Sequence, residues 1–172
     1  MQPVVSSENE KWYALKVRTK NEPTVEMILQ GKNYETLLPT YTEVRRYSDR
    51  VKKVNAALYP GYIFCRFDPN DRLPILTTPS VEYIVGTGKL PKAVGDNEME
   101  SIQRLVDSGA DARPWPFLQE GQKVRIEEGS LSGVEGYLVS IKGENRLVLS
   151  VELLQRSVAV HIDRTAVRPL PN

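Results

Sequence analysis

The strongest alternation of apolar and polar positions lies in residues 58–67, which predict a central β-strand. Successive side chains of a strand point to opposite faces, and here both faces carry apolar groups. We therefore expect both faces to be covered, one by helices and the other by a helix or a partner. Pro60 has no N–H and suits the first position of a strand, while Gly61 allows an unusual φ or a close backbone approach.

Shorter alternating segments predict further strands around this central one. Residues 12–17 and residues 81–85 each alternate with a period of two. Residues 35–44 are also expected to be extended, but Pro39 within them favours an edge strand or a bulge. These strands lie on both sides of the central one in the sequence, as expected for one small sheet.

Two helices are predicted between the strands. The first ends at Gly31, and Thr19 with Glu22 has the spacing of a capping box at its start. The second runs to about Ser108, and Asn97 with Glu100 repeats the capping-box spacing. The apolar positions of the second helix are expected to face inward: Met99, Ile102, Leu105 and Val106.

The pattern changes after residue 108. Residues 109–116 contain Pro114 and Pro116 and predict a semi-rigid linker. Short strands and turns follow, at a spacing that predicts a small β-barrel over residues 117–172. The expected organisation is a polar tail at 1–11, a first domain at 12–108, the linker, and the barrel. The barrel strands are expected at 121–126, 137–141, 146–154 and 157–162.

Composition and charge fit this reading. The chain has 172 residues, of which 40% are hydrophobic and 26% are charged, enough for one ordinary domain or two small ones. No apolar run approaches the roughly 20 residues that span a bilayer, and the first residues lack the apolar core of a secretory signal. We therefore expect a cytoplasmic protein that does not enter a membrane. The net charge is +1, so any contact with nucleic acid must come from a local patch.

Such a patch lies in residues 45–53, between two predicted strands. It contains five basic residues and one acidic residue, a local charge of +4, and it is expected to form a hairpin arm. Charge runs are commonly just solvated hairpin tips. Nevertheless, clustered cations with one tyrosine among them suit phosphates plus a stacked base, and we favour nucleic-acid contact. The cations are Arg45, Arg46, Arg50, Lys52 and Lys53.

No group of residues suggests catalysis, a metal or a cofactor. Cys65 is the single cysteine and His161 the single histidine, so neither a disulfide within the chain nor a Cys/His metal cluster is expected. Cys65 lies in an apolar strand and is expected to be an inert buried thiol, and His161 is expected to be exposed. Gly86 and Gly88 are interpreted as turn residues, because no phosphate-binding motif follows them. The sequence predicts a protein that is not an enzyme.

Tyr59 and Tyr62 flank the Pro-Gly corner of the central strand. Tyrosine combines a large apolar area with a polar tip, which suits a half-buried docking pocket. Plain core aromatics are the other reading, and composition alone favours them.

The sequence resembles the NusG family of transcription elongation factors along nearly its whole length. The matching stretches are residues 12–15, 38–40, 59–64 and 121–126, together with Val81, Gly86, Gly129, Gly133 and Gly136. The last group resembles the KOW motif, although Ser130 stands where proline is common. Residues 46–50 and 150–158 are similar to the specialised antiterminator paralogues of polysaccharide operons, the RfaH and UpxY kind.

The resemblance implies an α+β fold: an N-terminal NGN domain with a four-stranded antiparallel sheet flanked by helices, then a small SH3-like KOW β-barrel. It implies that the NGN domain docks on the clamp helices of the largest RNA polymerase subunit and suppresses pausing or termination. The basic arm would lie near upstream or non-template DNA. The residues that it implies for polymerase docking are Trp12, Tyr59, Tyr62 and Phe64.

For the barrel, the resemblance implies recruitment of a second partner, either a small-subunit ribosomal protein or the termination factor Rho, by a monomeric factor without cofactors. The expected partner surface is an exposed rim made of Leu131, Leu154, Gln155 and Arg156. The alternative is a KOW-containing, ribosome-associated RNA-binding protein. That alternative predicts a basic barrel, but residues 117–172 hold seven basic and seven acidic residues.

Overall fold

The computed structural model describes residues 8–118 and 121–171, and the chain divides into two compact units. The first unit combines the described residues up to Leu38 with Pro60–Val94, and the second combines Pro39–Tyr59 with the chain from Gly95 onward. The basic arm and the helix at 97–108 are thus grouped with the barrel and not with the first sheet. Most of the tail expected at 1–11 lies outside the described residues.

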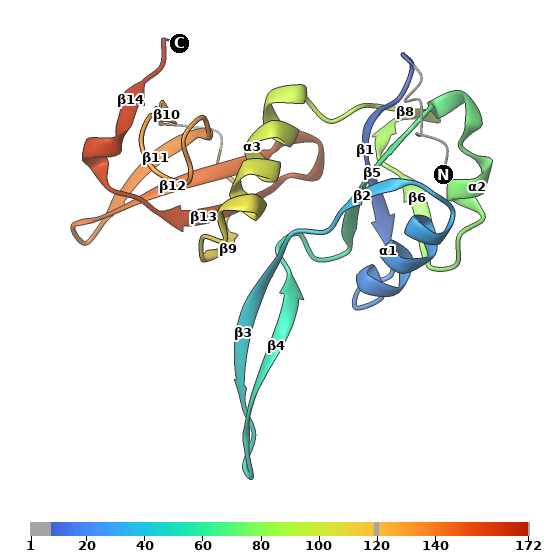
Figure 1. Cartoon of the computed structure of the whole chain (residues 1–172), viewed down its shortest axis with the longest axis horizontal. Coiled ribbons are helices and arrows are strands. Elements are labelled where there is room, and N and C mark those ends of the chain that lie inside the picture. Colours follow the sequence, from blue (N-terminus) through green and yellow to red (C-terminus); the bar gives the residue numbers. More distant parts are fainter. Residues whose placement is uncertain (1–7, 119–120, 172) are drawn as a thin grey trace. The chain divides into compact units, whose positions relative to one another are not determined.

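The first unit is built on a four-stranded sheet in which every neighbouring pair is antiparallel. The order is β2-β5-β1-β6, so β1 and β5 are its two central strands (Figure 1). This confirms the antiparallel sheet expected from the sequence, with the apolar segment near residue 62 at its centre. The strands are β1 (Lys11–Val17), β2 (Glu35–Leu37), β5 (Tyr62–Phe67) and β6 (Val81–Ile84).

One face of this sheet forms an apolar core with the helices of the unit. The helices are α1 (Glu22–Gly31), the single-turn α2 (Leu73–Leu76) and the 3₁₀ turn η1 (Pro69–Asp71). Tyr13 and Phe67 pack with ring centroids 4.7 Å apart. Leu29 of α1 and Ile75 of α2 belong to the same cluster and are fully buried. After β6, the chain forms a short two-stranded antiparallel hairpin made of β7 (Gly86–Thr87) and β8 (Leu90–Pro91).

Cys65 lies in this core and is expected to be unreactive in the folded protein. Its side chain is fully buried, and burial, with a smaller contribution from the Glu35 carboxylate, raises the pKa of its thiol to about 12. Since the thiolate is the reactive form, a thiol reagent at pH 8 should label the native protein only as fast as it opens. Labelling in denaturant should be rapid and stoichiometric. Rapid labelling in native buffer would contradict the burial.

Neither predicted capping box forms. Helix α1 begins at Glu22 with Asn21 as its N-cap, and α3 (Asp96–Ser108) begins after Gly95. In the described part of the chain, no side chain caps either helix start. The Glu22 carboxylate instead bonds a distant backbone amide, described below. Val106, expected to face inward, keeps 39% of its surface exposed.

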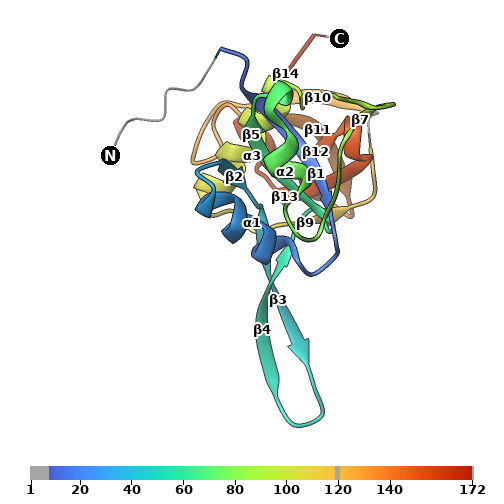
Figure 2. The same cartoon turned by 90° about the vertical axis from the view of Figure 1, so that its right-hand side faces the viewer.

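The second unit contains a two-stranded ribbon made of β3 (Thr40–Arg46) and β4 (Val51–Ala57). Figure 2 shows the two strands running side by side to a tight turn. The sequence predicted a hairpin arm here. The structure adds that Arg45, Arg46, Lys52 and Lys53 lie within the paired strands, and that only Arg50 lies in the turn.

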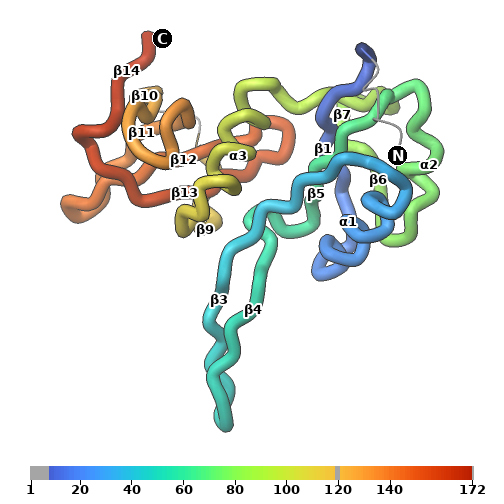
Figure 3. The backbone as a smooth tube through the Cα atoms, in the orientation of Figure 1, coloured from blue at the N-terminus to red at the C-terminus, as the bar shows by residue number. Residues whose placement is uncertain are grey.

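The rest of the second unit is α3 and a six-stranded sheet in the order β14-β10-β11-β12-β13-β9 (Figure 3). Its inward side chains, such as Val124, Leu147 and Val158, are fully buried, and this confirms the small KOW-type barrel. The strands are β9 (Ala112–Trp115), β10 (Gln122–Ile126), β11 (Glu135–Ile141), β12 (Glu144–Val151), β13 (Arg156–His161) and β14 (Val167–Pro169). Two 3₁₀ turns, η2 (Glu152–Leu154) and η3 (Arg164–Ala166), join them.

The segment expected to be a linker contributes a strand. Residues 112–115 form β9, which pairs antiparallel with β13, with Pro114 opposite Val158. Proline is tolerated in β9 because β9 is an edge strand, in which only alternate N–H groups face the neighbouring strand. The two prolines that suggested a linker therefore lie at a sheet edge and just beyond it.

Candidate functional site

The Tyr-Pro-Gly-Tyr corner is held by a buried carboxylate. Gly61 has φ +85° and its N–H donates to Glu22 Oε1 at 2.9 Å, while its carbonyl accepts from Val17 N–H at 2.8 Å. Glu22 is only 4% exposed although it is an acidic residue. The first residue of α1 thus fixes the backbone that leads directly into Tyr62.

We expect Glu22→Ala to weaken this corner and Glu22→Gln to preserve it. Alanine leaves the buried Gly61 N–H without its acceptor, which costs about 1–3 kcal/mol, whereas the glutamine side-chain oxygen can still accept. Urea unfolding of both variants measures the difference. Equal stabilities of the two variants would show that the carboxylate does not hold the corner.

Tyr62 lies on the sheet face opposite the apolar core. The register places Tyr62 directly across from Lys16, and Lys16 across from Tyr83 of β6, so the three side chains share one face. Lys16 Nζ is 5.7 Å from the centroid of the Tyr62 ring and 3.6 Å from Glu82 Oε2. Tyr83 is 51% exposed and Tyr62 is half-buried. These three residues are called the tyrosine row below.

The four residues expected to dock polymerase are not equally available. Trp12 shares the face of the tyrosine row and is half-buried, as is Tyr62. Tyr59 is 1% exposed and Phe64 is 0% exposed, so neither presents surface to a partner in this structure. Burial also raises the pKa of the Tyr59 hydroxyl. Tyr83 was missed, although the alternation of residues 81–85 together with the sheet order would have placed it here.

The two faces of the β3–β4 ribbon carry different sets of cations. Val44 is opposite Lys53 and Arg46 is opposite Val51, so Arg46 and Lys53 share one face. Arg45 is opposite Lys52 on the other face, and Arg45 is paired with Glu43 at 3.2 Å. In the turn, the Arg50 guanidinium lies 5.7 Å from the centroid of the Tyr47 ring.

The rim expected on the barrel is only partly exposed. Gln155 and Arg156 are exposed and Leu131 is half-buried, but Leu154 is 4% exposed and belongs to the barrel interior. The expectation that Leu154 lies on the exposed rim is therefore wrong, because η2 turns its side chain inward. Gln155 has φ +50°, the left-handed conformation that favours glycine.

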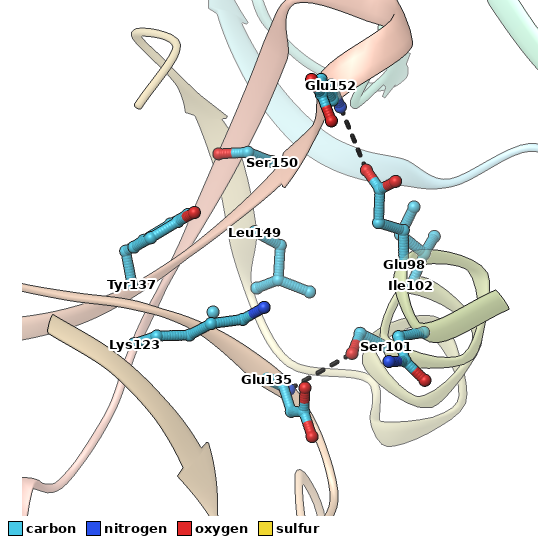
Figure 4. Close-up of a pocket in the computed structure, with 11 residues that line it drawn as sticks. Glu98, Ser101, Ile102, Lys123, Glu135, Tyr137, Leu149, Ser150 and Glu152 are labelled. Atoms are coloured by element: carbon cyan, nitrogen blue, oxygen red, sulfur yellow. Dashed lines mark hydrogen bonds between the residues drawn. The ribbon is translucent and has the colours of Figure 1, made fainter. Parts of the chain in front are cut away.

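Helix α3 is hydrogen-bonded to the barrel through side chains that the sequence reading did not single out. Glu98 Oε2 accepts from Glu152 N–H at 3.0 Å, and Ser101 Oγ accepts from Glu135 N–H at 3.2 Å (Figure 4). A cavity of about 220 Å³ lies beside these bonds, and Lys123 is among the residues that line it. Burial raises the pKa of the Glu98 carboxyl, although the bond from Glu152 acts in the opposite direction.

The described residues contain no group of three or more His, Cys, Asp or Glu side chains placed to hold a metal. His161 is exposed at the end of β13. Over residues 8–118 and 121–171, no helix has the length and apolar character needed to cross a membrane. The described elements form a helix-backed antiparallel sheet and a small barrel, and this two-part architecture defines the class of protein.

Comparison with known proteins identifies the family. Residues 10–103 match the NusG family, described as "Transcription termination factor nusG". The transcription termination/antitermination protein NusG of Helicobacter pylori strain J99 is 26% identical, over 88% of this chain and 93% of the relative. The NusG of Campylobacter jejuni is 28% identical over the same shares, and that of Escherichia coli K12 is 28% identical over 75% of this chain and 74% of the relative.

A solved structure supports the fold. The structure described as "Domain interaction in Thermotoga maritima NusG" superimposes with a TM-score of 0.55 at 20% identity, covering 94% of this chain and 98% of the other. The chain belongs to the NusG family, and its fold is that of an NGN domain followed by a KOW barrel. Members of this family are transcription factors, so the protein is not an enzyme.

Proposed function

We propose that this protein is a transcription elongation and antitermination factor that docks on the clamp helices of the largest RNA polymerase subunit. The observation that supports this most is the tyrosine row, a partly exposed aromatic surface around one lysine on the sheet face opposite the apolar core. Amphipathic aromatic side chains of this kind are typical anchors of protein interfaces. Trp12 extends the docking face, and Phe64 lies on the same face of the sheet but is fully buried.

A factor that binds polymerase without catalysing a reaction can still change the rate of transcription. A factor that binds the elongating state of polymerase more tightly than the paused state shifts the population toward elongation. In this proposal the basic arm lies near upstream or non-template DNA. The specialised, RfaH- or UpxY-like role is part of the same proposal and is supported by residues 46–50 and 150–158. The factor acts in the cytoplasm as a monomer.

The barrel is proposed to recruit a second partner, a small-subunit ribosomal protein or Rho. Gln155, Arg156 and the half-buried Leu131 offer a surface for it. The alternative, a ribosome-associated RNA-binding protein, is less well supported because the barrel has no excess of basic residues.

The test is binding of the full chain to purified core RNA polymerase, followed by transcription through a pause site and a terminator. We expect a stable complex and shorter pauses or increased read-through. A chain that binds neither polymerase nor elongation complexes, but binds ribosomal subunits, would replace this proposal with the RNA-binding alternative. Pull-down with the ribosomal protein and with Rho, compared between wild type and Arg156→Glu, identifies the barrel's partner.

A further inference from the structure

The cavity of about 220 Å³ beside α3 lies within the second unit and has no role in the proposed function. One wall is the first half of α3, and the other is formed by β10, β11, β12 and the start of η2 (Figure 4). A cavity of about 150 Å³ is large enough to hold benzene. This cavity therefore has room for a small organic molecule.

Lys123 extends into the cavity without a partner. Figure 4 shows its side chain running from β10 toward α3. Within residues 8–118 and 121–171, neither an ion pair nor a hydrogen bond engages the Lys123 ammonium, whereas Arg125 on the same face of β10 is paired with Glu135. The Lys123 ammonium is thus free to bind an anionic group such as a carboxylate.

The wall opposite Lys123 is acidic. Glu98 of α3 and Glu152 of η2 both line the cavity. The Glu98 carboxylate accepts from Glu152 N–H at 3.0 Å, and because a carboxylate has about four acceptor sites it keeps capacity for a ligand. Burial raises the pKa of the Glu98 carboxyl, and the Lys123 ammonium acts in the opposite direction. A second cation in the cavity would further favour the charged carboxylate.

The charges around the cavity favour a ligand that carries both signs. Glu135 is neutralised by Arg125, which leaves one cation, Lys123, and two carboxylates, those of Glu98 and Glu152. An inorganic anion would bind the lysine but be repelled by both glutamates, and a simple amine would bind the glutamates but be repelled by the lysine. A molecule with one carboxylate and two cationic groups satisfies all three side chains.

The cavity also has an apolar part. Ile102 of α3 and Leu149 of β12 line it and are almost fully buried. Such side chains are suited to contact with methylene groups, which the long side chains of lysine and arginine contain. A metal ion does not fit, because the described residues hold no group of three His, Cys, Asp or Glu side chains placed to bind one.

We propose that this cavity binds a free basic α-amino acid, whose carboxylate accepts from Lys123 and whose two cationic groups donate to Glu98 and Glu152. Lysine and arginine share the chemistry that the cavity requires. The site lies beside η2, the turn that leads into Gln155 and Arg156. Binding of the amino acid does not depend on the proposed function, so the two can be tested separately.

The test is isothermal titration calorimetry of the full chain with lysine, arginine and three analogues of lysine. Cadaverine lacks the carboxylate, 6-aminohexanoate lacks the α-ammonium, and Nα-acetyl-lysine methylamide has lysine's side chain as it occurs within a polypeptide. We expect lysine or arginine to bind with a Kd on the order of 0.1–1 mM. Each analogue should bind at least about tenfold more weakly, because it loses a charge-assisted hydrogen bond.

Two lysines of the barrel give a matched pair of variants. Lys123→Gln removes the charge that binds the carboxylate, whereas Lys142→Gln makes the same change in the turn between β11 and β12, outside the cavity. We expect at least about a tenfold loss of affinity with the first and no change with the second. Glu98→Gln keeps an acceptor for Glu152 N–H but removes the negative charge, and it should also bind the amino acid about tenfold more weakly.

Thermal unfolding gives an independent readout of binding. A ligand at ten times its Kd should raise the Tm of the wild type by about 2–4 °C, and the same scans without ligand verify that each variant is folded. No binding of either amino acid up to about 10 mM, cadaverine binding as tightly as lysine, or equal affinities of the two lysine variants would each overturn the proposal.

Equal affinity for Nα-acetyl-lysine methylamide and for lysine would assign the cavity to a basic side chain of a partner protein, and would overturn the proposal as well. Binding of the wild type to polymerase is measured in parallel, without amino acid. Polymerase binding combined with a failure to bind either amino acid would reject the cavity as a ligand site and leave the docking proposal standing.

Discussion

Tyr62→Asp is expected to abolish binding to core RNA polymerase, with a loss of at least about 100-fold. The substitution removes the half-buried aromatic ring from the tyrosine row and places a carboxylate where a docked partner would exclude water. The isolated protein should remain folded, because the new carboxylate faces the Lys16 ammonium across the strand pair. Tyr62→Ala, which only removes the ring, should lose less.

The matched control is Leu73→Asp. Leu73 lies on α2, which packs on the opposite, core face of the same sheet through Ile75, and it is 68% exposed. It therefore adds the same charge to an exposed apolar position away from the proposed docking face. Circular dichroism verifies the fold of each variant. If Tyr62→Asp binds polymerase as tightly as Leu73→Asp does, the docking face is elsewhere.

Gly136→Ala is expected to destabilise the barrel by at least about 2 kcal/mol. A Cβ at this position would lie 2.5 Å from the carbonyl oxygen of Val148 and 3.1 Å from Leu147 Cγ. Gly136 is in β11, opposite Val124, and the contacted oxygen belongs to the backbone of the neighbouring strand β12. Backbone in the middle of a sheet cannot move aside without disturbing its ladder. This close approach of the β12 backbone explains why glycine is needed at position 136 of the KOW-like motif.

Gly31→Ala provides the control, because no atom lies within 4 Å of the Cβ it would add at the end of α1. It should be neutral or stabilise the protein by about 0.4–1 kcal/mol, since alanine reduces the freedom of the unfolded chain. In a Trp12→Phe background the remaining tryptophan, Trp115 in β9, reports on the barrel during denaturant unfolding. An unchanged barrel transition in Gly136→Ala would show that the strands separate easily at this point.

The sequence predicted the elements whose signals are local and periodic. The alternation around Tyr62 indicated a central strand, the cation-rich stretch indicated a hairpin arm, and the short strands after residue 120 indicated a barrel. The structure has all three. Cys65 and His161 also have the burial that their strand patterns predicted.

The features that the sequence did not predict depend on contacts between distant segments. Glu22 has the spacing of a capping box, but its partner is Gly61, 39 residues away, and local spacing cannot reveal such a partner. The burial of Tyr59 and Phe64 is likewise set by packing between distant segments. Composition alone favours core aromatics, whereas the family resemblance implies that these residues dock a partner. The exposure of Val106 followed neither from helical period nor from resemblance.

The pairing of β9 with β13 determines where a fragment that contains the barrel should begin. A fragment that starts at residue 117 would begin beyond β9 and leave the β13 ladder, from Ser157 to Val160, without its neighbour. Unpaired strand edges of this kind recruit other chains, so such a fragment is prone to associate edge to edge. A fragment that starts before Ala112 retains the proline-containing strand, which ends the ladder with a residue that cannot donate to a further strand.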